Sequence, residues 1–172
     1  QDVNTATTRS VWEQLDKPPL LHPSRLQEQL VSDGHLGRKT GRGAYDYSDE
    51  KPQPSINIER RPLDVSEDLQ RAIQTFTQRA VEQPGSESQN YTFARVLCAL
   101  IVQAHLAAER GVADPDNIDI ALKYGVNYPQ GPFEWTRAIG PDAVAQLLEA
   151  LNATVDDGRF ACPAISATAS AR

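Results

Sequence analysis

Ile118-Asp-Ile-Ala-Leu-Lys-Tyr-Gly125-Val-Asn-Tyr-Pro-Gln-Gly131-Pro-Phe-Glu-Trp135 is the most informative stretch of this chain. A helix is predicted to end at Gly125, because glycine readily adopts the backbone conformation that closes a helix. The Asn-Tyr-Pro-x-Gly-Pro that follows predicts a rigid turn. The proline after Gly131 predicts a second short helix, which closes at Ile139-Gly140. Helix, fixed turn and helix together favour an architecture built by packing helices against each other.

The composition is that of a soluble globular protein. The chain has 172 residues, 40% hydrophobic and 23% charged, which is enough for one domain or two small ones. Its net charge of −6 disfavours nucleic-acid and anionic-membrane partners. No apolar run approaches the ~20 residues that span a bilayer, and Gln1–Ser10 shows no signal peptide. The two cysteines suggest no disulfide framework, so we expect a reducing, cytoplasmic location.

Outside this stretch the sequence predicts helices and almost no strand. The strongest helix is Asn90–Glu109, and another begins at Asp64 with Glu67 as its capping box. Only Ile56–Ile58 has the character of a short extended piece. The predicted helices span residues 2–15, 24–33, 64–83, 90–109, 114–124 and 132–139, with a last one from 141. Their expected buried positions are Val3, Val11, Trp12 and Leu15; Phe93, Val96, Leu97, Leu100, Ile101 and Ala104; and Val144, Leu147, Leu148 and Leu151.

The chain also contains a candidate internal sequence repeat. Asp2 matches Asp142, Val11 matches Leu151, and the Pro23 that restarts a helix matches Pro163, all at one constant offset. Chance similarity between two amphipathic helices is the alternative. We favour a duplication whose copies stack to bury a shared face, with the first copy present only in part. Because the sequence contains no methionine, we expect it to be a processed product or a piece of a longer protein.

Two segments resemble one enzyme family. Leu36–Tyr47 (LGRKTGRGAYDY) is similar to the end of the C-terminal domain of the 3-hydroxyacyl-CoA dehydrogenases, and Arg95–Gly140 is similar to its start. The second similarity rests on the Gly-Val-Ala at 111–113, the Asn-Ile-Asp at 117–119 and the turn at 125–132. The end of one copy before the start of another resembles the tandem bacterial enzymes of the 3-hydroxybutyryl-CoA and 3-hydroxyadipyl-CoA dehydrogenase type, found in aromatic and phenylacetate catabolism.

The resemblance implies an all-α fold, a helical bundle like the C-terminal domains of the 3-hydroxyacyl-CoA and 6-phosphogluconate dehydrogenases. We expect residues 1–48 to form the C-terminal half of a first helical copy and residues 49–63 a linker. Residues 64–165 are expected to form a second copy, and residues 166–172 a frayed tail.

Departures from the family limit the chemistry that the resemblance implies. Family members bind NAD on a Gly-x-Gly-x-x-Gly turn, whereas Gly37, Gly41 and Gly43 have a different spacing and follow no predicted strand. The family's catalytic His lies upstream of the helical domain, and Ala94 stands where an active copy carries a catalytic Asn. The resemblance therefore implies no catalytic residue and no cofactor here. NAD, and the oxidation of 3-hydroxyacyl-CoA to 3-oxoacyl-CoA, belong to the parent enzyme.

Arg38, Lys39 and Arg42 form the basic cluster of the chain. They are candidates for contacting a phosphate of the acyl-CoA substrate, and a solvated turn is the alternative. The residues of the Pro-Gly-Pro turn are expected to be structural: Gly125, Asn127, Pro129, Gly131, Pro132 and Trp135. The aromatic residues around this turn either line a substrate pocket or pack in the core, namely Tyr128, Phe133 and Trp135.

No metal site is predicted. Asp114, Asp116 and Asp119 lack the glycine and the terminal glutamate of a calcium loop, so they are interpreted as carboxylates favoured at a helix start. The histidines His22, His35 and His105 lie far apart, and His105 is interpreted as a residue at the boundary of the core.

The sequence thus predicts the helical scaffold of a 3-hydroxyacyl-CoA dehydrogenase. In the parent enzyme it would close over the acyl-CoA side and mediate a subunit contact in a homodimer. By itself it is expected neither to bind NAD nor to turn over substrate. A stand-alone helical protein-interaction module and an independent enzyme with an unrecognised site stay open as alternatives.

Overall fold

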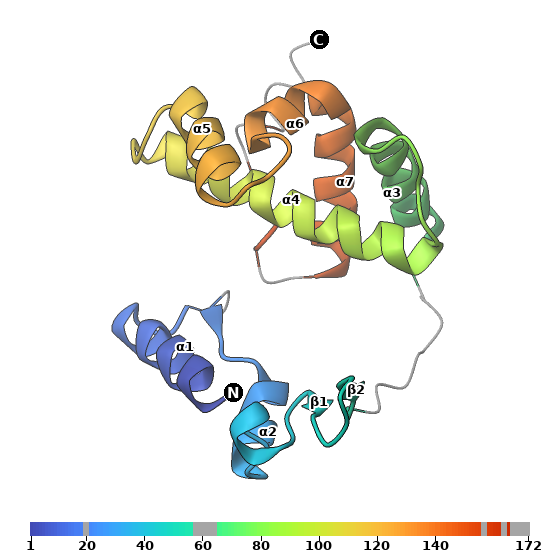
Figure 1. The fold of residues 1–172 in the computed structure, drawn as a ribbon. Helices are drawn as coiled ribbons and strands as arrows, with labels where there is room; N and C mark the ends of the chain where they lie inside the picture. The colour runs from blue at the N-terminus through green and yellow to red at the C-terminus, as the bar shows by residue number, and fades with distance from the viewer. Residues whose placement is uncertain (19–20, 57–64, 156–157, 163–164, 166–172) are drawn as a thin grey trace. The chain divides into compact units, whose positions relative to one another are not determined.

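The structure is a computed structural model that describes residues 1–18, 21–56, 65–155, 158–162 and 165. The chain divides into two compact units, the N-terminal unit of residues 1–62 and the C-terminal unit of residues 63–172. Helices make up most of the described residues, which confirms the all-α prediction (Figure 1). The assignment of these units to two copies of one domain stays a prediction.

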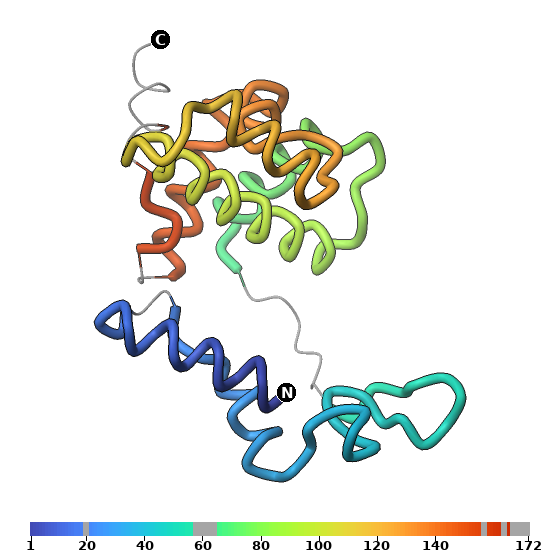
Figure 2. The backbone as a smooth tube through the Cα atoms, turned by 60° about the vertical axis from the view of Figure 1, so that its left-hand side comes forward, coloured from blue at the N-terminus to red at the C-terminus, as the bar shows by residue number. Residues whose placement is uncertain are grey.

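The C-terminal unit is a bundle of five helices within the described residues. It contains α3 (Glu67–Ala80), α4 (Glu87–Glu109), α5 (Pro115–Gly125), α6 (Pro132–Ile139) and α7 (Pro141–Thr154). Helix α3 packs along α7, and α4 runs across α3, α6 and α7 (Figures 1 and 2). The core between them is apolar and includes Leu69, Phe76, Leu97, Ile101, Val144, Leu147, Leu148 and Leu151.

Helix α7 buries the face that its spacing predicts. Val144, Leu147, Leu148 and Leu151 are all buried, since residues three and four apart share one side of a helix. Helix α4 differs from the prediction at Val96, which is 65% exposed. Val96 follows the buried Ala94 by two residues, and two residues correspond to about 200° around a helix. The buried face of α4 contains Ala94, Leu97, Cys98, Ile101, Val102 and Ala104.

Two helix starts also differ from the predicted ones. Helix α3 begins at Glu67, where the Ser66 hydroxyl accepts the backbone N–H of Leu69 over 3.3 Å; the predicted cap, Asp64, lies outside the described residues. Helix α4 begins three residues before Asn90. The backbone N–H of Ser86 donates to Gln89 Oε1 over 2.8 Å, so the Ser-x-x-Gln signal starts the helix before the predicted first residue.

The N-terminal unit contains α1 (Asp2–Gln14), α2 (Arg25–Ser32) and a 3₁₀ turn, η2 (Arg38–Thr40). Strand β1 (Tyr45–Asp46) pairs antiparallel with β2 (Gln53–Pro54), so the expectation that only residues 56–58 are extended is wrong here; Figure 2 shows the chain doubling back between the two strands. Of the extended piece predicted at 56–58, residues 57 and 58 lie outside the described residues.

Helix α1 does not bury the apolar side chains that its sequence suggested. Val3, Val11 and Leu15 are exposed, and the Trp12 indole is half-buried with Nε1 donating to the Pro18 carbonyl over 3.1 Å. No side chain caps the start of α1, because its N-cap is Gln1 without a side-chain hydrogen bond. Helix α7, which the predicted duplication pairs with α1, does bury its apolar face. The two helices therefore differ in burial, and the internal duplication stays a prediction.

Helix α4 is long and apolar enough to cross a membrane by length and composition. The expectation that no segment reaches this length is therefore wrong. The core helix of a soluble protein passes the same test, and α4 places Leu97, Cys98, Ile101 and Val102 in the core.

Candidate functional site

The corner between α5 and α6 carries the residues that the sequence singled out. Helix α5 starts at Pro115, and the Asp114 carboxylate accepts the backbone N–H of Asn117 over 3.0 Å. This backbone donor, followed by the Asn117 side chain, lowers the pKa of Asp114. Asp114 is therefore a helix-start carboxylate, as predicted.

The turn after α5 has a fixed backbone. Asn127 has a φ of +62°, in the left-handed region where asparagine is one of the few tolerated side chains. The backbone N–H groups of Val126 and Tyr128 both donate to the Leu122 carbonyl, over 3.2 and 3.3 Å. The turn thus ends α5 and leads the chain directly into α6.

Helix α6 is capped by a residue from another helix. The backbone N–H groups of Phe133 and Glu134 donate to the two carboxylate oxygens of Asp119, over 2.8 and 3.0 Å. Asp119 lies in α5 and is 3% exposed. Pro132 has no N–H, and the N–H of Gly131 donates to Glu134 Oε2 over 3.0 Å. The first-turn donors that α6 leaves unpaired are therefore satisfied from α5 and from α6 itself.

This cap explains the glycine at position 131. A Cβ added there would meet three side-chain atoms of Asp119, all closer than the 3.0 Å that real Cβ atoms keep. The backbone of Gly131 can approach the buried carboxylate because glycine has no side chain. Asp119 and Gly131 thus form one structural device that sets the angle between α5 and α6.

The interpretation of Asp119 as a helix-start carboxylate of α5 is wrong, since it caps the next helix. The sequence did contain a signal for this role. Pro132 at the first position and Glu134 at the third mark the start of α6, yet Gly131 in the cap position has no oxygen to offer. The missing acceptor had to come from elsewhere, and Asp119 on the preceding helix supplies it.

The aromatic residues of the corner serve packing. Phe133 is buried, and its ring lies 4.3 Å from the ring of His105, centroid to centroid. Trp135 packs against the core and lies 5.9 Å from the Tyr128 ring. Lys123 donates to Glu134 over 2.7 Å, which raises the pKa of Lys123 and lowers that of Glu134. The corner is a rigid junction tied by packing and charge.

His105 gives this junction a dependence on pH. Its ring is half-buried, 3.4 Å from Thr136 Oγ1, and desolvation lowers its pKa below the usual 6.5 although Asp119 acts in the opposite direction. On acidification below pH 6.5, the unfolded chain binds this proton before the folded chain does, so folding stability falls. Between about pH 7.5 and 5.5, a range above the titration of carboxylates, we expect the free energy of unfolding of His105→Gln to fall less than that of the wild type. Urea unfolding at each pH measures this difference. His35→Gln is the control, and an unchanged pH slope in His105→Gln would contradict the assignment.

The basic cluster of the N-terminal unit is spread over separate contacts. Lys39 pairs with Asp2, and the Arg38 guanidinium lies 5.4 Å from the Tyr47 ring centroid. Arg42 forms backbone bridges with Gly37 and Asp46. Two of the three side chains therefore already have partners within the unit, and the contact with a CoA phosphate stays a prediction.

Ala94 lies in the core of the C-terminal unit. Its side chain is fully buried, on the face of α4 that also carries Leu97 and Cys98. Burial raises the pKa of the Cys98 thiol, so this neighbour is not an activated nucleophile. The position where the resemblance places a catalytic Asn thus faces apolar side chains of the unit itself.

We expect Ala94→Asn to destabilise the C-terminal unit by about 2–4 kcal/mol, because a larger polar side chain would be forced into a packed apolar site. Urea unfolding followed by circular dichroism measures the change. The matched control is Gln103→Asn on the exposed side of α4, with an expected change within about 0.5 kcal/mol. Equal unfolding midpoints for the two variants would show that position 94 is not enclosed as described.

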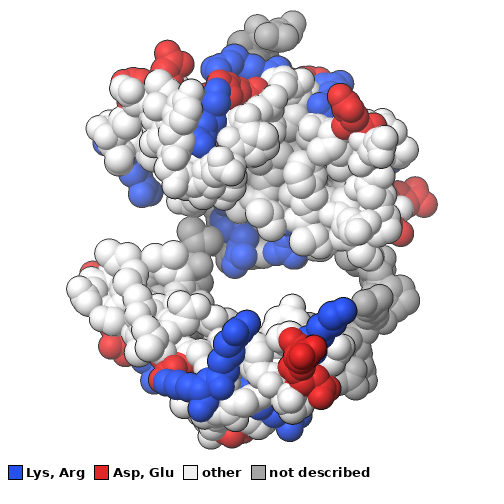
Figure 3. All heavy atoms as spheres, in the orientation of Figure 1, with Lys and Arg blue, Asp and Glu red and all other residues white. Residues whose placement is uncertain are grey.

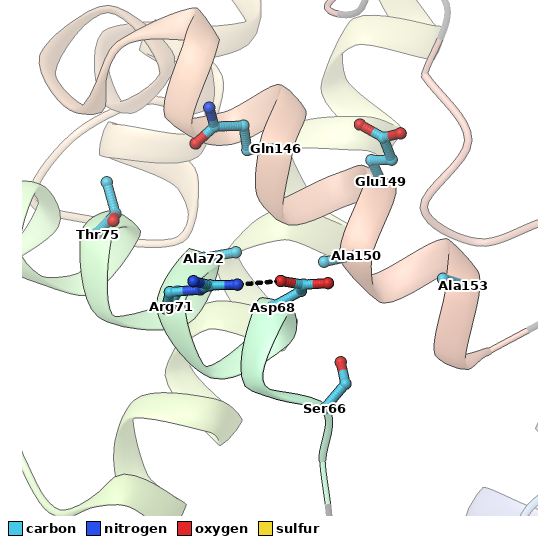
Figure 4. A pocket seen from close by; sticks show the side chains of 9 residues that line it. All are labelled: Ser66, Asp68, Arg71, Ala72, Thr75, Gln146, Glu149, Ala150 and Ala153. Atoms are coloured by element: carbon cyan, nitrogen blue, oxygen red, sulfur yellow. Dashed lines mark hydrogen bonds and ion pairs between the residues drawn. The ribbon is translucent and has the colours of Figure 1, made fainter.

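A groove of about 490 Å³ runs between α3 and α7 (Figure 4). Small side chains line much of it, including Ala72, Ala150 and Ala153, and Asp68 pairs with Arg71 at its edge. Among the described residues, no group of His, Cys, Asp or Glu is placed to hold a metal ion. In the view of Figure 3, basic side chains are interspersed with acidic ones on both units.

Comparison with known proteins agrees with this architecture. Residues 91–172 match the family described as "3-hydroxyacyl-CoA dehydrogenase, C-terminal domain". The 3-hydroxyadipyl-CoA dehydrogenase of Escherichia coli (strain K12) is 25% identical over 220 residues, covering 93% of this chain and 46% of that protein. A probable 3-hydroxybutyryl-CoA dehydrogenase of Bacillus subtilis (strain 168) is 36% identical over 70 residues, covering 40% of this chain and 24% of that protein.

A solved structure shares the fold. The crystal structure of 3-hydroxybutyryl-CoA dehydrogenase from Escherichia coli K12 superposes with a TM-score of 0.66 at 24% identity, over 99% of this chain and 49% of that one. The chain spans less than half the length of each of these three proteins.

The fold and the α5–α6 corner define the C-terminal unit as an all-α domain whose corner is a structural junction. Over residues 91–172 this unit is similar to the C-terminal domain of the 3-hydroxyacyl-CoA dehydrogenase family. The resemblance stated from the sequence is confirmed.

Proposed function

We propose that this chain is the helical, substrate-side scaffold of an NAD-dependent 3-hydroxyacyl-CoA dehydrogenase, which oxidises 3-hydroxyacyl-CoA to 3-oxoacyl-CoA. The family match over residues 91–172, which includes the whole α5–α6 corner, carries the proposal. The buried Ala94 favours a scaffold role for the C-terminal unit, because no polar group from that position can orient a substrate carbonyl. The buried thiol of Cys98, which forms no disulfide, agrees with a reducing, cytoplasmic location, which we also propose.

The glycines of this chain do not fit an NAD site. Gly37 and Gly41, with φ of +106° and +72°, flank the 3₁₀ turn η2, and no described strand leads into them. A dinucleotide site needs a strand, a glycine-rich turn and a helix whose N-terminus faces the pyrophosphate. We therefore assign the nicotinamide chemistry to a separate domain of the parent enzyme.

Sequencing the gene upstream of the Gln1 codon tests the proposal. We expect the reading frame to encode a strand, a Gly-x-Gly-x-x-Gly turn and a helix, and the whole product to form NADH from 3-hydroxybutyryl-CoA and NAD. A different preceding domain, or a whole product without this activity, would overturn it. A stand-alone interaction module would then be the better account.

We further propose that the outer side of α4 makes the subunit contact of a homodimer. Val96 is exposed there beside a shallow apolar hollow of about 510 Å³, lined by Ser88, Gln89, Thr92, Phe93 and Val96. Figure 3 shows a broad uncharged area over this part of the C-terminal unit. With a net charge of −6, two copies repel each other, so an uncharged contact surface favours their pairing.

We expect Val96→Glu to shift the protein to monomers in sedimentation velocity, because a charge would be desolvated in the contact, with a loss of affinity of at least about tenfold. Val112→Glu is the matched control, since Val112 is equally apolar and exposed but lies in the turn after α4. A wild-type chain that stays monomeric at high concentration, or equal behaviour of the two variants, would contradict the contact.

A further inference from the structure

Arg95 is held in place on α4 by aromatic side chains. Its Nη1 donates to the Tyr91 hydroxyl oxygen over 3.0 Å, and its guanidinium lies 5.4 Å from the Tyr91 ring centroid. It also lies 5.8 Å from the ring centroid of Phe160, a residue of the core. Cation–π contacts of this kind orient the guanidinium plane.

No carboxylate of the described residues pairs with Arg95. Three other arginines of the C-terminal unit do have such partners: Arg71 pairs with Asp68, Arg79 with Asp142 and Arg137 with Asp119. Arg95 is half-buried, so part of its hydration is lost, and no negative charge of the described residues compensates for it. A guanidinium has five N–H donors in a planar fork, which matches the oxygens of a carboxylate or a phosphate.

We propose that Arg95 and Tyr91 form a binding site for an oxyanion, the carboxylate or phosphate group of a small molecule. The Tyr91 oxygen accepts from Arg95 and so keeps its own hydrogen to donate. The guanidinium fork and this hydroxyl then present two neighbouring donors to one anionic group, in a charge-assisted arrangement. The site requires neither the dehydrogenase activity nor the homodimer, and the adjacent Ala94 offers no reacting group.

NMR titration of the whole 172-residue chain tests the site. Sodium phosphate, sodium acetate and sodium chloride are added in separate series at one constant ionic strength, and the backbone amide signals of residues 91–95 are followed in every variant, together with the side-chain Nε–H signal where Arg95 is present. We expect a saturable shift with half-saturation at or below about 10 mM for phosphate, acetate or both, and none with chloride. The relative affinities of phosphate and acetate identify the preferred group.

Three variants separate the site from general charge effects. Tyr91→Phe keeps the ring and removes the hydroxyl, and we expect it to weaken binding about tenfold. Arg95→Lys keeps the charge and removes the planar fork, and we expect saturation to disappear. Arg110→Gln removes an exposed arginine at the end of the same helix and should leave the titration unchanged. Thermal unfolding, compared with the wild type, confirms that each variant is folded.

Two results would overturn the proposal. One is the absence of a saturable shift for either oxyanion in the folded wild-type chain. The other is a titration that folded Tyr91→Phe and Arg95→Lys reproduce unchanged.

Discussion

Gly131→Ala is expected to destabilise the C-terminal unit by about 3 kcal/mol or more, through overpacking and the disruption of buried hydrogen bonds. The new Cβ would overlap the Asp119 carboxylate, which is buried and holds the N–H groups of Phe133 and Glu134. Either the carboxylate leaves the N-terminus of α6, or the backbone of the turn moves away from α5. Both movements break the hydrogen bonds that orient α6 on the bundle.

Gly125→Ala is the matched control for this change. Gly125 lies at the end of α5, has no positive φ, and a Cβ added there would meet nothing within 4 Å. Alanine at such a site should be neutral or should stabilise the helix by up to about 1 kcal/mol. Urea unfolding followed by circular dichroism compares both variants with the wild type. Gly131→Ala unfolding at the same midpoint as Gly125→Ala would show that the close approach of Gly131 to Asp119 is wrong.

The sequence predicted the elements of the fold well where local signals and tertiary packing agree. Helix α7 has Pro141 at its first position and four apolar residues at helical spacing, and all four are buried. Val96 was misplaced because α4 carries apolar residues around much of its circumference, so the sequence alone does not show which side meets α3 and α7. The β1–β2 pairing was missed because two residues per strand leave no period to detect.

In the candidate site, the sequence predicted the roles of residues that depend on local backbone geometry, but not the role of Asp119. Asn127, Gly131 and Pro132 belong to a local turn, and their structural role could be predicted from the backbone needs of each residue type. Asp119 acts over a distance of 14 residues along the chain, on the backbone of Phe133, and its position near Asp114 and Asp116 suggested a different helix. Only the packing of α5 against α6 shows that its carboxylate reaches the next helix.

Asp119→Ala is expected to destabilise the C-terminal unit at least as much as Gly131→Ala does, by about 3–5 kcal/mol. It removes the acceptor of two backbone N–H groups, one of them fully buried, and the ion-pair partner of Arg137 at 3.5 Å. Asp116→Ala removes an exposed carboxylate from the same helix and should change stability by no more than about 0.5 kcal/mol. Equal stability of the two variants in urea would show that Asp119 does not cap α6.

The double variant Asp119→Ala/Gly131→Ala makes the link between the two residues measurable. If the methyl group introduced by Gly131→Ala destabilises by colliding with the Asp119 carboxylate, that collision is absent once the carboxylate has been removed. We therefore expect the double variant to lose less stability than the sum of the single variants, with a coupling energy of about 1–3 kcal/mol. Strict additivity would mean that Gly131 is required for its backbone alone. A clear coupling would mean that the glycine and the buried aspartate act as one device, because each permits the other at the junction of α5 and α6.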